Sequence, residues 1–199
     1  MSPPEASAAK AVSSPLVPAT ARGEATRRKL LAAAEEEFGS KGFHAASVSS
    51  ITLRAGVGQG TFYLYFHTKE EVFTIVVQGI GYTLRRQMAQ AASRHPDRER
   101  ACLESFLEFT LRNPGLFRIV QESPFVDEAA FRDYYESLAR SFGACVRPGA
   151  SDVDTRAWTL MSVAHFLGMR HCIWQGQKPD EQTFEEVLRL LGQPQPTLN

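Results

Sequence analysis

The feature that most constrains the fold of this chain is a succession of helical patterns that continues from Ala25 almost to the C-terminus. In each long segment, apolar residues recur three or four positions apart, which is the spacing that gives a helix one apolar face. No segment shows the alternation typical of a half-buried strand, and no internal repeat is evident. We therefore expect an all-α fold of about nine helices.

The first three helices are expected to be short and to follow one another closely. The first begins at Ala25 and ends at Gly42, a glycine suited to a left-handed cap. Ser47 is a favourable N-cap for the second helix, which Gly56 interrupts, and the third covers residues 59–66. Three short helices with a glycine-containing turn between the second and the third form a helix-turn-helix.

Start and stop signals mark the remaining helices. Thr68-Lys69-Glu70-Glu71 matches a capping box, and Asn113-Pro114 places a polar cap before a proline at the first helical position. Together with the prolines and glycines between segments, these signals predict helices at about 68–93, 97–112, 114–121, 127–147, 152–176 and 180–191.

Composition narrows the class of protein. The chain has 199 residues, of which 43% are hydrophobic, and a formal net charge of zero, which argues against packaging of bulk nucleic acid. Residues 1–22 are rich in Pro, Ala and Ser, so we expect a disordered tail, followed by the helix-turn-helix at 23–68 and a larger helical domain at 69–199. Neither a secretion signal nor a membrane-spanning stretch is evident, and we expect a cytoplasmic protein that does not contact a membrane.

The cysteines and histidines give no sign of a metal site. Cys102, Cys145 and Cys172 are odd in number and widely spaced, so we expect reduced, partly buried thiols rather than a disulfide framework. His165, His171 and Cys172 suggest a metal or redox sensor at first sight. Adjacent side chains on a helix point about 100° apart, however, which is a poor geometry for sharing one ion. We expect no metal and no cofactor.

Residues 55–66, Ala-Gly-Val-Gly-Gln-Gly-Thr-Phe-Tyr-Leu-Tyr-Phe, are the most informative stretch. Gly58 and Gly60 keep the start of the third helix free of side-chain bulk, so that a phosphate or a base edge can approach. Gln59 can read a base edge in the major groove, and Thr61 offers a hydroxyl and a methyl group. Taken alone, Gly58-Gln59-Gly60 can equally be a flexible turn.

A longer pattern surrounds this stretch. It consists of Leu30-Leu31-Ala32-Ala33-Ala34, Phe38, Lys41-Gly42-Phe43, Ser47-Val48, Ile51, Ala55-Gly56-Val57, Gly60-Thr61-Phe62-Tyr63-Leu64-Tyr65-Phe66 and Lys69-Glu70-Glu71. The pattern resembles the TetR family of repressors over Thr26 to about Val72, about a quarter of the chain; Thr52 stands where the family more often has Ala. The resemblance implies an N-terminal helix-turn-helix DNA-binding domain followed by a helical ligand-binding and dimerisation domain.

The resemblance also implies which residues contact DNA. Those expected to face bases are Gln59, Gly60, Thr61 and Tyr65, and those expected to hold phosphates are Ser47, Tyr63 and Lys69. The alternative for Tyr65 is a packed aromatic ring, and the alternative for Lys69 is a solvated side chain without a partner.

More aromatic residues lie after the helix-turn-helix than within it. A subset is expected to line an elongated apolar pocket, and the candidates are Phe106, Phe109, Phe117, Arg118, Tyr135, Trp158, His165 and Phe166. The alternative is that these rings are ordinary core and that Arg118 meets only water. The arrangement is similar to family members that sense fatty or aromatic acyl thioesters.

The segments 152–176 and 180–191 resemble the two helices through which family members dimerise as a four-helix bundle. The candidate interface residues are Met161, Ala164, Gly168 and His171 on the first helix and Phe184, Val187, Leu188 and Leu191 on the second. The alternative is that both faces belong to the core of a single chain.

These observations favour a ligand-responsive repressor that binds palindromic operator DNA as a homodimer and is released by a small hydrophobic or acyl-type effector, such as an acyl thioester or an aromatic compound. The alternative is a constitutive DNA-binding interaction protein of the same fold, without an effector. The chain contains no GxSxG, HExxH, P-loop or Rossmann signature, so we expect no enzymatic activity.

Overall fold

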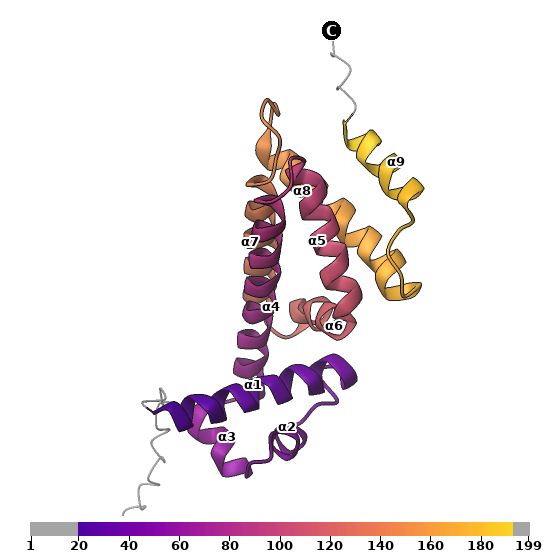
Figure 1. Cartoon of the computed structure of the whole chain (residues 1–199). Coiled ribbons are helices and arrows are strands. Elements are labelled where there is room, and N and C mark those ends of the chain that lie inside the picture. The colour runs from indigo at the N-terminus through magenta and orange to yellow at the C-terminus, as the bar shows by residue number, and fades with distance from the viewer. Residues whose placement is uncertain (1–19, 193–199) are drawn as a thin grey trace, which may run out of the picture.

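The structure is a computed structural model that describes residues 20–192, and over this range it is entirely helical (Figure 1). Its helices are α1 (Ala21–Lys41), α2 (Val48–Ala55), α3 (Gln59–Tyr65), α4 (Lys69–Ala92), α5 (Arg98–Arg112), α6 (Pro114–Glu122), α7 (Glu128–Gly143), α8 (Val153–Leu167) and α9 (Glu181–Gly192). A 3₁₀ turn, η1 (Ser123–Phe125), precedes α7, and a π-helical segment, η2 (Gly168–Trp174), continues α8. The expected all-α fold is confirmed.

The first helix begins earlier than its apolar pattern indicates. Thr20 acts as the N-cap, its hydroxyl accepting a hydrogen bond from the Gly23 N–H at 3.1 Å, so α1 starts at Ala21 rather than at Ala25. Ala21 and Arg22, expected in the tail, are therefore helical. The rest of the predicted disordered tail, residues 1–19, lies outside the described residues.

Local sequence signals set the other helix ends in this region. Ser47 caps α2 in a reciprocal capping box with Ser50, and Thr68 accepts the Glu71 N–H at the start of α4. Gly56 ends α2 in the left-handed conformation, with φ of +68°. Gly42 also has a positive φ, of +85°, but its ψ of 164° turns the chain away from α1 rather than into a left-handed turn.

Helices α1–α3 form a small unit at one end of the long helix α4 (Figure 1). Its core contains the fully buried side chains of Leu30, Phe38, Ile51, Phe62 and Phe66. Aromatic packing continues into α4, because the ring of Phe73 meets that of Phe38 edge-on at 5.2 Å between centroids. Helices α1–α3 are therefore held by a core that α4 helps to complete, although α1, with 21 residues, is not the short helix expected from the sequence.

The second part of the molecule is built around α4, α5, α7 and α8, which pack along one another, with α9 lying at the outer edge (Figure 1). The helix expected at 152–176 covers Val153–Trp174, and its geometry changes from α-helical to π-helical at Gly168. A Cβ atom added to Gly168 would lie 3.3 Å from the ring of Phe106, so glycine permits the close approach of this segment to α5. None of the described helices is long and apolar enough to cross a membrane.

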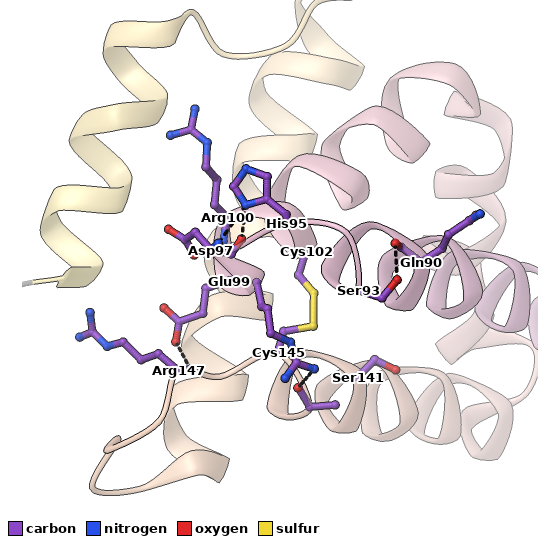
Figure 2. The surroundings of a disulfide bond; sticks show 12 residues. Gln90, Ser93, His95, Asp97, Glu99, Arg100, Cys102, Ser141, Cys145 and Arg147 are labelled. Carbon is purple, nitrogen blue, oxygen red and sulfur yellow. Dashed lines mark hydrogen bonds between the residues drawn. A yellow bond between two sulfur atoms is a disulfide. The ribbon is translucent and has the colours of Figure 1, made fainter.

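The expectation of reduced cysteines is wrong for two of the three. Cys102 near the start of α5 and Cys145 just after α7 form a disulfide, with 6.8 Å between their Cα atoms (Figure 2). The 43-residue separation gives no local signal in the sequence; the antiparallel course of the helices brings the two residues together. The Glu99 carboxylate beside the bond accepts the Arg147 N–H at 3.0 Å, and Cys172 is a buried free thiol.

Candidate nucleic-acid interface and ligand groove

The exposed side of α3 gathers several residues expected to contact DNA. Phe62 is fully buried and fixes the orientation of the helix, which leaves Gln59 and Gly60 exposed, Tyr63 57% exposed and Thr61 half-buried. A Cβ atom added to Gly60 would meet no other atom within 4 Å, so the surface around it is open. The structure thus brings four of the seven expected residues to one accessible helix.

Two further expected DNA contacts are already engaged within the protein. Tyr65 is half-buried against the core, beside Phe66, as its packing alternative requires. The Ser47 hydroxyl accepts the Ser50 N–H at 3.0 Å, although the residue remains exposed. Both residues therefore have a structural role, and their contact with DNA stays a prediction.

Lys69 holds α4 against the loop between α1 and α2. Its ammonium group donates hydrogen bonds to the carbonyl oxygens of Phe43 and Ala46, at 2.8 and 2.9 Å, and lies 4.1 Å from the centroid of the Phe43 ring. The alternative of a lysine without a partner is wrong. An ammonium group has three N–H donors, so one remains for a phosphate.

A buried carboxylate that the sequence did not single out joins α1 to α2. Glu37 is 2% exposed and binds Lys41 and Arg54, each with an N···O distance of 2.7 Å. The hydrogen bond from Lys41, with a smaller contribution from Arg54, lowers the pKa of Glu37 to about 2 against the opposing effect of burial. Glu37 is therefore ionised near neutral pH and fixes the angle between the two helices.

The expected ligand-pocket residues lie in two adjoining places. Phe106, Phe109 and Phe117 surround an inner cavity of only about 10 Å³, so this interior is nearly filled. Trp158 and Phe166 line an open groove of about 630 Å³ between α7 and α8.

Tyr135 and His165 line both the inner cavity and the groove, and so stand between them. The Tyr135 hydroxyl lies 3.4 Å from His165 Nδ1, and the His165 ring stacks on Phe117 at 5.1 Å between centroids. Burial lowers the pKa of His165, so its imidazole is neutral near pH 7.

Arg118 does not line the pocket, contrary to expectation. Its guanidinium donates to the Ser40 carbonyl oxygen at 2.9 Å, because Arg118 lies on the face of α6 that meets the end of α1. Nearby, the Glu122 carboxylate accepts the Phe43 N–H at 2.7 Å. Between these contacts the backbones of α1 and α6 touch: a Cβ atom added to Gly39 would lie 3.2 Å from the Gly115 Cα. Helix α6 is thus a junction between the two parts of the chain.

The expected dimer face of α8 is wrong. All four of its residues, Met161, Ala164, Gly168 and His171, are buried against helices of the same chain, so they are not available to a partner. On α9, Phe184 is buried beneath the guanidinium of Arg100, and Val187, Leu188 and Leu191 are half-buried. The large apolar side chains that these elements expose are instead Val153, Phe166, Trp174 and Leu190.

No group of three or more His, Cys, Asp or Glu side chains within residues 20–192 is arranged to hold a metal ion.

Comparison with known proteins relates the helix-turn-helix to a family of bacterial regulators. Residues 30–75 match the family model described as bacterial regulatory proteins, tetR family. The HTH-type transcriptional regulator YdgC of Bacillus subtilis is 42% identical over 65 residues, a third of each chain. The HTH-type transcriptional activator FasR of Mycolicibacterium smegmatis is 33% identical over 105 residues, 51% of this chain and 48% of that protein. The matched regions thus span between a third and about half of these relatives.

Solved structures extend the likeness to the whole fold. FadR of Bacillus subtilis, in complex with stearoyl-CoA, superposes with a TM-score of 0.69 at 16% identity, covering 83% of this chain and 97% of that one. A TetR-family regulator of Syntrophomonas wolfei gives a TM-score of 0.69 at 18% identity, covering 88% and 99%. Residues 30–75 therefore match the DNA-binding region of the TetR family of bacterial regulatory proteins in sequence, and the remaining helices match solved TetR-type structures in fold.

Proposed function

We propose that this protein is a ligand-responsive transcriptional repressor that binds palindromic operator DNA as a homodimer and is released by a small effector with an apolar body. The family is one of DNA-binding regulators rather than enzymes. The observation that carries the proposal is α6: Phe117 stacks on His165 in the effector part, while Arg118 and Glu122 of the same helix hold the helix-turn-helix.

The exposed side of α3 would enter the major groove. Gln59 and Thr61 would discriminate bases there, while Tyr63 and the remaining donor of Lys69 would contact phosphates. In a dimer on B-DNA the two α3 helices must lie about 34–36 Å apart, so a small rotation of one unit is enough to lose the operator.

The effect of ligand binding would be transmitted to α3 through two helices. Besides α6, α4 spans both parts: Lys69 binds the loop between α1 and α2, and Ile80 and Leu84 line the inner cavity. A molecule that displaces Phe117 or Leu84 would move these helices, provided that it binds the released state more tightly than the DNA-bound state.

The dimer would form through the exposed side of the C-terminal helices. Phe166, Trp174 and Leu190 are 63%, 69% and 56% exposed. Contiguous patches of exposed apolar side chains mark interaction surfaces more often than single exposed residues do. A dimer built on them leaves the buried face of α8 inside its own chain. As a repressor the protein would act in the cytoplasm.

The test is a gel shift on the DNA upstream of the protein's own gene, with and without a panel of aromatic compounds and acyl thioesters. The structure of FadR with stearoyl-CoA is one reason to include the thioesters. A specific shift that one compound abolishes supports the proposal. A specific shift that no compound abolishes favours the constitutive interaction protein, for which the nearly filled inner cavity is the supporting observation.

A further inference from the structure

We propose that the bond between Cys102 and Cys145 is a reversible thiol-exchange site, at which a small anionic thiol attacks Cys145 and forms a mixed disulfide with it. The inference goes beyond the proposed function and does not depend on DNA binding. A repressor acts in the cytoplasm, where disulfides are rare and those that occur are usually transient or redox-sensing. The proposal is carried by the access to Cys145, the charge around it and the contacts that remain when the bond opens.

The two cysteines differ in access. Cys102 lies in the second turn of α5 and is fully buried. Cys145, 3% exposed, follows α7 and forms part of the wall of an open pocket of about 460 Å³, together with residues 96–99 and 146–148. Cys102 is not among the described residues that line this pocket. A thiol that enters the pocket therefore meets the Cys145 side of the bond.

The pocket lies apart from the surface proposed for the dimer. It is formed by the loop between α4 and α5, by the first turn of α5 and by the segment that follows α7. The exposed apolar side chains assigned to the dimer, Phe166, Trp174 and Leu190, do not line it. The exchange site therefore requires no residue that the proposed dimer covers.

The charge around the pocket favours an anionic thiol. The charged side chains among its described lining residues are Asp97, Arg98, Glu99 and Arg147. The Arg156 guanidinium, outside the pocket, binds the Glu99 carboxylate with N···O distances of 2.6 and 2.7 Å and compensates its charge. Three arginines thus stand against two carboxylates, which leaves one positive charge among these residues. Nearby cations stabilise a thiolate, which is the nucleophilic form of a thiol.

The exchange step needs no further oxidant or reductant. The sulfur of the incoming thiolate bonds to Cys145 Sγ as the bond between the two cysteines breaks, and the electron pair of that bond leaves on Cys102 Sγ. A proton from water then converts Cys102 into a thiol, the form that a buried sulfur favours. Cys172 shows this effect in the same protein, because burial raises its pKa to about 11. One disulfide is lost and one is formed.

Hydrogen bonds that involve no sulfur keep the two cysteines close after the bond opens. The Arg98 guanidinium donates to the Ala144 carbonyl oxygen at 2.6 Å, and the Glu99 carboxylate accepts the Arg147 N–H at 3.0 Å (Figure 2). These bonds join the first turn of α5 to the segment that follows α7. Cys102 therefore stays in place to attack the mixed disulfide, which expels the small thiol and restores the original bond.

The first test compares Cys102→Ser with Cys145→Ser in the full-length protein. Both variants lose the same disulfide, so each is the control for the other, and circular dichroism checks that both are folded. Each is treated with the symmetrical disulfide of 2-mercaptoethanesulfonate, and the adducts are located by peptide mass spectrometry. We expect Cys145 to be modified at least about tenfold faster than Cys102, because only Cys145 borders the pocket. Equal rates, or no modification of either thiol, overturn the proposal.

The second test uses the parent protein and two thiols of similar length and opposite charge, 2-mercaptoethanesulfonate and cysteamine. Opening of the disulfide is followed by alkylation of the released thiols. Each rate is divided by the rate of the same thiol with the protein unfolded in urea, which removes differences in intrinsic reactivity. We expect the normalised rate of the anionic thiol to be at least about threefold higher. Equal normalised rates overturn the proposal, as does a rate that is independent of thiol concentration and therefore limited by unfolding.

A charge variant tests the pocket itself. The bond to Glu99 is made by the Arg147 backbone, so Arg147→Gln removes the guanidinium and leaves that contact in place. The substitution should slow opening by 2-mercaptoethanesulfonate about twofold to fivefold and should not slow opening by cysteamine. Arg140→Gln, which removes an exposed arginine of α7 that does not line the pocket, should leave both rates unchanged. An equal response of the two variants overturns the anionic site.

Discussion

The helix-turn-helix and the C-terminal helices differ in what determines the shape of their exposed surfaces. In α1–α3 a few buried rings, including Phe38 and Phe62, orient α3 so that its polar side faces solvent. In α4–α9 the interior is almost completely filled, with an inner cavity of only about 10 Å³, and the open groove lies on the outside of α7 and α8. The difference shows that a surface fixed by a local core can be read from a short motif, whereas a groove between distant helices depends on the whole packing.

The strongest test of this difference is Phe62→Ala. The side chain is fully buried and its removal should cost about 3–5 kcal/mol of unfolding free energy, measured by urea denaturation. Because the loss falls in α1–α3, operator binding should fail in gel shifts while the C-terminal helices stay folded. Tyr63→Ala, on the exposed side of the same helix, should change stability by less than about 0.5 kcal/mol. Unchanged operator binding by Phe62→Ala would show that α3 does not depend on this core.

The disulfide offers the converse test, in the C-terminal part. It closes a loop with a sequence separation of 43, and Cys102→Ser should lower the unfolding free energy by about 2–4 kcal/mol. Operator affinity should be preserved, because the bond joins the start of α5 to the end of α7, and these helix ends lie away from α3 (Figure 1). Dithiothreitol should lower the Tm of the parent protein but leave that of Cys102→Ser unchanged. A reductant-insensitive parent would contradict the bond.

Lowering the pH should destabilise the two parts of the chain by protonating different carboxylates, Glu37 in the helix-turn-helix and Glu99 in the C-terminal part. The pKa of Glu37 is lowered to about 2 from an ordinary value of 4.5, so its stabilisation is complete above about pH 4.5 and is lost as the pH falls towards 2. Glu37→Gln should cost about 1–3 kcal/mol at pH 7 and flatten the dependence of Tm on pH between 5 and 2.5. Parallel curves for variant and parent would contradict this role.

Glu99→Gln is the matched variant in the C-terminal part. Burial raises the pKa of Glu99, but the bonds from Arg156 and Arg147 more than offset this and lower it overall. Its contribution is therefore also lost in acid, and Glu99→Gln should likewise flatten the dependence of Tm on pH below about pH 4.5.

The smallest expected effects concern DNA sequence. Gln59→Ala should reduce discrimination between operator variants by about tenfold, since one bidentate contact to a base is worth about 1–3 kcal/mol. Tyr63→Ala should weaken binding to all sequences alike, because phosphate contacts carry no sequence information. Competition gel shifts with operator variants distinguish the two. If both variants lose affinity evenly, Gln59 does not read a base.

Local signals in the sequence predicted much of the fold. Ser47, Gly56 and Thr68 act within a few residues of themselves, and each ends or starts a helix as expected. The early start of α1 was missed because Thr20, its cap, lies before the first apolar repeat.

Features that depend on distant residues were not predictable in the same way. The apolar face of α8 at Met161 and Ala164 has the same pattern whether its own chain or a partner covers it, and here its own chain does. Arg118 was expected to line the pocket. Its actual position against Ser40 was not predictable, because it follows from how α6 meets α1. Periodicity reports that a face is buried, but it does not report which element buries it.

The contact between Gly39 and Gly115 bears on the construction of chimeric regulators. At this point the two parts of the chain meet through backbone alone, so the fit is independent of which side chains surround the effector. Another helical effector part could be joined to this helix-turn-helix without redesign of that contact, provided that it also brings a glycine at the start of its sixth helix. An alanine there would place a methyl group about 3.1 Å from the Gly39 Cα, so the two helices would have to separate by a few tenths of an ångström.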